Sequence, residues 1–146
     1  MDIPKQAHVL VIDGAKSLFF RNTGSAQDPK LTVEGHSEQD SAATSEQGSD
    51  APGTSHSSVG NSRSSVEQTD FHQQDEDRFA VRAADMLKRE VLAGKVDALI
   101  IVAAPKTLGV LRQHLHGEVQ KRIVGEIAKD FAGRPTDEIT AAILSH

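Results

Sequence analysis

The chain lacks cysteine, tyrosine and tryptophan, and only five of its 146 residues are phenylalanine. Without cysteine it has no disulfide framework, no thiolate zinc site and no cysteine nucleophile, as expected in a reducing compartment. Without tyrosine and tryptophan it has few side chains on which nucleic-acid bases stack. The absences therefore exclude a disulfide-stapled secreted domain and disfavour an aromatic RNA-binding surface.

Long apolar runs and an excess of positive charge are also missing. No segment is long enough for a transmembrane helix, and residues 1–6 lack the apolar centre of a signal peptide. The formal net charge of −5 does not fit a general polyanion binder. We expect a cytoplasmic protein without membrane insertion.

The apolar residues that are present suffice for one core. With 146 residues, 37% of them hydrophobic, residues 1–146 are expected to form a single domain. The most apolar segment, residues 96–105, is rich in β-branched side chains and predicts a strand buried on both faces. A strand of this kind needs a sheet covered by helices, so the predicted fold class is α/β.

The N-terminal third predicts an antiparallel meander. Apolar residues 8–12 and 17–20 flank Asp13-Gly14, a hairpin signal because glycine readily takes the positive φ of a tight turn. Residues 30–34 alternate in polarity and predict a third strand.

Residues 75–94 predict the helix that crosses over to the central strand. Asp75, Glu76 and Asp77 suit the positive end of the helix dipole, and Gly94 suits the stop. Apolar side chains recur at helical spacing at Phe79, Ala83, Met86, Leu87 and Val91. This crossover makes the central strand parallel to at least one neighbour.

Two further helices are predicted, one beginning at Pro105 and one at Thr136. Between them, residues 119–131 fit either a helical stripe interrupted by Gly125 or a strand over residues 122–127.

Residues 35–72 predict a disordered or loosely ordered insertion loop. Ten serines lie between Ser37 and Ser65, and large apolar side chains are scarce. Such a segment buries too little surface to offset the roughly 1–2 kcal/mol needed to fix each residue's backbone. A loop of this length is often functional, and an inert insertion is the alternative.

Two long stretches, residues 102–112 and 119–130, carry a family resemblance that residues 60–72 and 76–80 share. They resemble the bacterial host-attachment proteins, which are grouped with bacterial relatives of the archaeal and eukaryotic peptide-chain release factors. The resemblance implies the release-factor middle-domain fold, a ribonuclease-H-like mixed sheet of about five strands with helices. It also implies that residues 122–129 form a strand.

The same resemblance places the serine-rich loop where release factors carry the Gly-Gly-Gln loop that enters the ribosomal peptidyl-transferase centre. No Gly-Gly-Gln occurs in this chain. Peptidyl-tRNA hydrolysis is therefore not expected, and we predict that the protein is not an enzyme.

Three sets of residues suggest chemistry, and each has a simpler explanation. Ser64, Ser65, Asp70 and His72 contain the residue types of a catalytic triad, but a serine-rich loop supplies them without geometry. The other two sets are His114 with His116, and Asp13 with Asp97.

The two histidines are two residues apart, so on a helix they diverge and make a poor metal pair. The two aspartates lie at opposite ends of strands that are expected to run parallel, and a turn explains Asp13. We predict no catalytic, cofactor-binding or metal-binding residue.

Residues 95–134 are locally basic, with 7 Lys/Arg against 4 Asp/Glu. They favour either an RNA-facing patch or an ordinary solvated helix face. The residues predicted to make interactions lie here and at the end of the loop: Arg63, Glu67, Asp70, His72, Lys106, Arg112, Lys121 and Arg122.

Two functions remain open. The first is a non-enzymatic interaction protein of the host-attachment family with an unknown protein partner. The alternative is a ribosome- or tRNA-associated relative of translation factors that lacks the hydrolytic loop.

Overall fold

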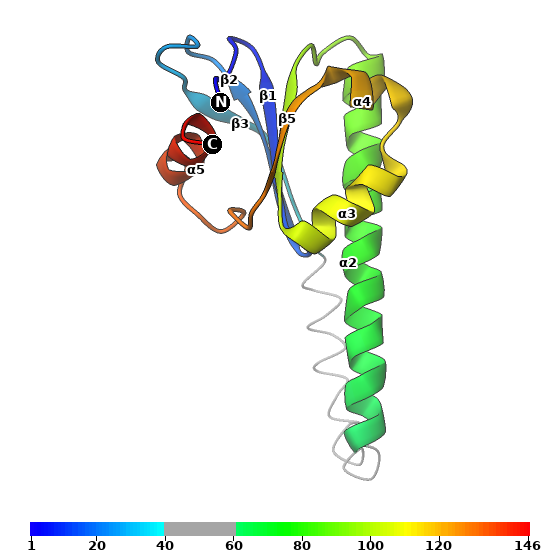
Figure 1. Ribbon diagram of the computed structural model, residues 1–146. Helices are drawn as coiled ribbons and strands as arrows, with labels where there is room; N and C mark the ends of the chain where they lie inside the picture. The colour runs from blue at the N-terminus through cyan, green and yellow to red at the C-terminus, as the bar shows by residue number, and fades with distance from the viewer. Residues whose placement is uncertain (40–60) are drawn as a thin grey trace.

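The computed structural model describes the backbone of residues 1–39 and 61–146 and the side chains of residues 1–39 and 72–146. A five-stranded sheet forms the middle layer (Figure 1). The described elements are, in chain order, β1 (His8–Ile12), β2 (Lys16–Asn22), β3 (Leu31–Glu38), α2 (Asn61–Leu92), β4 (Leu99–Ala103), α3 (Pro105–His114), α4 (Gly117–Arg122), β5 (Ile123–Ala128) and α5 (Thr136–Leu144).

The sheet has the strand order β3-β2-β1-β4-β5. β2 pairs antiparallel with both β1 and β3, whereas β4 pairs parallel with both β1 and β5. The predicted α/β fold with an antiparallel meander and a parallel central strand is therefore confirmed. Ile123–Ala128 is a strand, as the family resemblance implied.

Each face of the sheet builds its own apolar core, because alternate side chains of a strand point to opposite faces. On one face, Leu10 and Phe19 pack with α2, α3 and α4. On the other face, Val9 and Phe20 pack with α5. All five residues of β4 are buried, as expected for a central strand covered on both faces.

The β1–β2 turn, residues 13–15, forms at the predicted place but by a different mechanism. Among the described glycines only Gly94 has a positive φ, so Gly14 does not provide the expected left-handed conformation. Instead the Asp13 carboxylate accepts hydrogen bonds from the backbone N–H groups of Ala15 (2.9 Å) and Lys16 (2.8 Å). Gly14 is suited to its place because Glu76 packs against it, where a Cβ would lie 2.5 Å from the Glu76 Cδ.

The predicted loop, residues 35–72, overlaps a strand at its start and a helix at its end. β3 continues to Glu38, which pairs with Lys16, so ladder hydrogen bonding extends the strand despite its polar sequence. Helix α2 already begins at Asn61, and no glycine or proline interrupts it before Leu92. The prediction of disorder for residues 40–60 concerns residues outside the described part of the chain.

Helix α2 divides into two halves of different character. Among its described side chains, those from residue 72 on, the buried ones lie between Phe79 and Val91, and we call residues 79–92 the packed half. Residues 61–78, the arm, extend beyond the edge of the sheet (Figure 1). None of the described arm side chains, residues 72–78, is buried. Neither α2 nor any other described helix is long and apolar enough to cross a membrane.

Candidate functional site

The predicted interaction residues fall on two separate surfaces. Arg63, Glu67 and Asp70 lie on the arm, at positions whose side chains are not described. His72 also lies on the arm and is exposed. The arm thus gathers four of the eight predicted residues on one element, and the other four lie on α3 and α4.

The basic residues of α3 and α4 are partly neutralised by neighbouring acids. Arg112 bonds Glu126 at 2.7 Å, and Lys121 bonds Glu118 at 3.1 Å. The hydrogen bond from Lys121, together with its charge, holds the pKa of Glu118 below its ordinary value. Lys106 and Arg122 are exposed and form no ion pair with a described residue. The uniform basic patch suggested by the sequence is therefore reduced to isolated charges.

Of the residues weighed for catalysis and metal binding, some lie at arm positions without a described side chain, and others have structural roles. Ser64, Ser65 and Asp70 lie on the helical backbone of the arm, where their side chains are not described. The His116 Nδ1 accepts a hydrogen bond from the backbone N–H of Glu118 and caps α4. No cluster of three potential metal ligands occurs among the described side chains.

The two aspartates weighed as a magnesium pair lie far apart along the strands. Asp13 follows the C-terminal end of β1, and Asp97 precedes the N-terminal end of β4. Because β1 and β4 run parallel with His8 opposite Leu99, these positions are at opposite ends of the sheet, as predicted.

A pocket that the sequence did not predict lies between the packed half of α2 and the β2–β3 edge of the sheet. Its volume is about 350 Å³, within the range of small-molecule sites. Ser17, Phe19 and Glu34 line it from the sheet. The residues that line it from α2 include Phe79, Arg82, Met86, Arg89 and Glu90. We call this cavity the α2 pocket.

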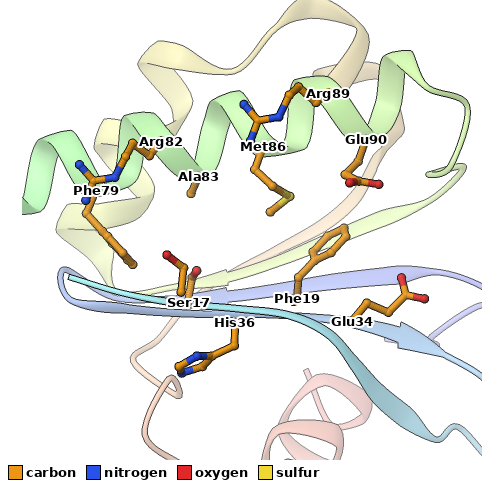
Figure 2. A pocket seen from close by; sticks show the side chains of 12 residues that line it. Ser17, Phe19, Glu34, His36, Phe79, Arg82, Ala83, Met86, Arg89 and Glu90 are labelled. Carbon is orange, nitrogen blue, oxygen red and sulfur yellow. The ribbon is translucent and has the colours of Figure 1, made fainter. Parts of the chain in front are cut away.

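Figure 2 shows how these side chains lie. Phe79, Met86 and Glu90 point from the helix toward the sheet, and Phe19 points from β2 toward the helix. His36 points away, on the other side of the sheet. The middle of the α2 pocket is therefore apolar, with charged side chains at its rim.

A bulge in β3 brings Glu34 to this pocket. Phe19 pairs with Gly35 but Phe20 pairs with Val33, so Glu34 is the extra residue. Its carboxylate accepts a 2.6 Å hydrogen bond from the Arg21 Nε and lies 2.9 Å from the His8 Nε2. Burial raises the pKa of Glu34, but the hydrogen bonds and charges of Arg21 and His8 outweigh burial and lower it below its ordinary value.

His8 packs against Phe19, which lines the pocket. Its ring stacks on Phe19 with centroids 5.0 Å apart, and its side chain is 5% exposed. The Nδ1 of His8 is buried and has no hydrogen-bond partner among the described residues. Phe19 is thus held between a fixed histidine ring and the open pocket.

Two arginines at the rim have no acidic partner within the described part of the chain. Neither Arg82 nor Arg89 forms an ion pair with a described residue, although the Arg82 guanidinium lies 5.7 Å from the centre of the Phe79 ring. The sequence contained a signal for this helix face. Arg82 and Arg89 are seven residues apart and so share one face of the helix, as do Phe79 and Met86. The opposite wall of the pocket, formed by β2 and β3, depends on the bulge in β3. The spacing of residues in the sequence did not reveal that bulge.

The chain was compared with protein families and with curated proteins. No curated protein matches it. Residues 6–143 match the family described as bacterial archaeo-eukaryotic release factor family 12. That description names release factors and not attachment to host cells, so the host-attachment interpretation stays a prediction. Because the match covers nearly the whole chain, we conclude that the protein belongs to bacterial archaeo-eukaryotic release factor family 12.

Proposed function

We propose that this protein associates with ribosomes as a non-hydrolytic relative of release factors, and that the arm of α2 contacts a protein of the ribosome. The observation that carries the proposal is the arm itself. α2 has 32 residues, a length of about 48 Å, and all of its buried side chains in the described part of the chain lie in its C-terminal half. The arm therefore presents a polar helix surface away from the core.

A polar helix outside the core gains little from tertiary packing. Isolated helices are marginal in water, and stability normally comes from an apolar face. The described arm side chains bond one another, Gln73 to Asp77 at 2.9 Å and Arg78 to Asp75 at 3.1 Å. Docking against a partner would supply apolar packing that the described residues do not give to the arm.

The charge of the arm suggests which part of a ribosome it meets. Residues 61–78 contain two arginines against five acids, Glu67, Asp70, Asp75, Glu76 and Asp77. This excess of negative charge repels phosphate and attracts basic protein surfaces. We therefore propose that the arm contacts a basic protein surface, while exposed basic side chains such as those of Lys106 and Arg122 approach RNA.

The missing Gly-Gly-Gln supports the non-hydrolytic part of the proposal. Release factors carry this motif in the loop that corresponds to the segment before the arm, and this chain lacks it throughout. The proposed role is binding without peptidyl-tRNA hydrolysis.

Gln39 and Glu76 both lie at the β1–β2 turn, so most of the chain between them can be replaced by a short linker. The backbone N–H of Gln39 bonds the Ala15 carbonyl, and its side chain bonds the Gly14 carbonyl, both at 2.7 Å. Glu76 packs against the same Gly14. A Gly-Ser linker of about six residues in place of residues 41–72 therefore spans the gap without disturbing a described buried side chain.

The experiment compares this shortened protein with the intact chain. Intact protein is expected to sediment with ribosomes at low salt and less at moderate salt, because phosphate contacts are salt-dependent. The shortened protein is expected to remain folded by circular dichroism and to stay in the supernatant. Intact protein that does not sediment at low salt contradicts ribosome association, and equal sedimentation of both proteins contradicts the role of the arm.

A further inference from the structure

The α2 pocket has an asymmetric distribution of charge. Glu34 and Glu90 lie at one end, on opposite walls, and Ser17 and Arg82 lie at the other (Figure 2). Phe19 and Met86 lie between these ends. A ligand that fits this pattern carries an anionic group, a flat apolar body and a hydrogen-bond donor, in that order.

We propose that the α2 pocket binds a nucleoside phosphate whose base carries an amino group. The base lies against Phe19 and Met86, because aromatic and thioether side chains contact flat rings favourably. Its amino group donates to the Glu34 and Glu90 carboxylates, as carboxylates accept from cytosine amino groups in base recognition. The phosphate is bound by Arg82 at the other end of the pocket.

Three features of the pocket favour this ligand. A volume of about 350 Å³ suits a small molecule rather than a protein side chain. Arg82 has no acid to neutralise it among the described residues, so its positive charge is available to an anion. Arg21 and His8 each bond Glu34, which keeps its carboxylate ionised and fixed as an acceptor.

Arg89 has a second role at the rim. Figure 2 shows that its side chain, like that of Arg82, runs along the helix and does not reach across to the sheet. The two residues are seven apart, or about 10 Å along the helix axis. A phosphate bound by Arg89 would therefore belong to another nucleotide of the same strand than the phosphate bound by Arg82, so the nucleotide in the pocket is either free or part of single-stranded RNA.

This inference does not depend on the proposed ribosome contact. The pocket lies on the packed half of α2, whereas the proposed contact lies on the arm. Binding at the pocket and sedimentation with ribosomes can therefore fail separately.

The test is a calorimetric titration of the intact protein with adenosine monophosphate, uridine monophosphate and inorganic phosphate. Adenosine monophosphate is expected to bind saturably and more tightly than either of the others. Arg82→Gln is expected to weaken this binding roughly tenfold, since it removes a charge-assisted hydrogen bond. Glu90→Gln is expected to reduce the preference for adenosine over uridine monophosphate.

Lys88→Gln is the matched control. Lys88 is exposed on the same helix, carries the same charge as Arg82 and does not line the pocket. This variant is expected to bind like the parent. Equal weakening by Lys88→Gln and Arg82→Gln, or adenosine monophosphate that binds no better than inorganic phosphate, would overturn the proposal.

A six-residue oligoadenylate distinguishes the two sources of the nucleotide. Binding more than about tenfold tighter than the mononucleotide, and weakened by Arg89→Gln, supports an RNA strand. Binding no tighter than the mononucleotide supports a free nucleotide. Absence of binding by both ligands contradicts the assignment of the pocket.

Discussion

The two halves of helix α2 are continuous in backbone and opposite in environment. In the packed half, Phe79, Leu87 and Val91 are buried against the sheet. In the arm, the described side chains from His72 to Arg78 are exposed or half-buried, and two hydrogen bonds join pairs of them, Gln73 with Asp77 and Arg78 with Asp75. The packed half is therefore held in place by the core, whereas the described side chains of the arm are at least partly accessible to solvent.

The difference separates the half of α2 that stabilises the fold from the half that is proposed to contact a partner. Apolar contacts fix the packed half, so it can form one wall of a pocket without moving. The described side chains of the arm, residues 72–78, are not buried and so are less constrained by the core, as suits the proposed contact with a partner. Substitutions in the two halves should therefore differ in kind as well as in size.

The largest effect is expected at Leu87. This side chain is fully buried between α2 and the sheet, so Leu87→Ala leaves a cavity and should lower the free energy of unfolding by about 2–5 kcal/mol. Gln74→Ala, its counterpart in the arm, is exposed and should change it by less than about 0.5 kcal/mol. Urea denaturation of both variants measures the contrast, and equal effects would show that the arm is packed.

A smaller effect is expected at Gly14, where the arm meets the body. Gly14→Ala forces the Glu76 side chain aside, and we expect a loss of about 1 kcal/mol in thermal denaturation. The loss should disappear in a Glu76→Ala background, because the steric conflict is then removed. Gly109→Ala is the control: nothing lies within 4 Å of its added Cβ, and the helix should gain about 1 kcal/mol.

The sequence predicted the packed half of α2 well and the arm poorly, for a physical reason. Burial selects apolar residues at helical spacing, which is why Phe79 and Leu87 identified the helix. The acids Asp75 and Glu76 looked like a helix start because acids suit that end, yet the helix continues toward the N-terminus to Asn61. Outside the core, only the absence of glycine and proline distinguishes such a helix from a loop.

The candidate site was harder to predict than the fold. Strand pairing follows from alternation and turns, and the predicted antiparallel meander with a parallel central strand is confirmed. The α2 pocket depends on the bulge that redirects Glu34, and one extra residue in a polar edge strand leaves no pattern in the sequence. The paired state of Arg112 also depends on Glu126, 14 residues away in β5.

Acidification is expected to lower the stability of the protein through the network that Glu34 forms with Arg21 and His8. The pKa of Glu34 is lower in the folded protein than its ordinary value of 4.5, so the folded state binds fewer protons near that pH. Its stabilising contribution is complete above the unfolded pKa and is lost as pH falls through the folded pKa. Urea midpoints measured from pH 7 to pH 3 should fall less steeply for Glu34→Gln than for the parent, and identical slopes would contradict the network.

The smallest effect is expected from the ion pair between Arg78 and Asp75. The Arg78 side chain is 62% exposed, and the two residues are three apart on a helix, so solvent screens most of their attraction. Arg78→Ala should lower the free energy of unfolding by roughly 0.5 kcal/mol or less, and 1 M salt should remove the difference from the parent. Salt-resistant destabilisation above about 1 kcal/mol would mean that the arm packs more firmly than its exposure indicates. The division between a packed half that stabilises and an arm that recognises would then have to be placed before residue 78.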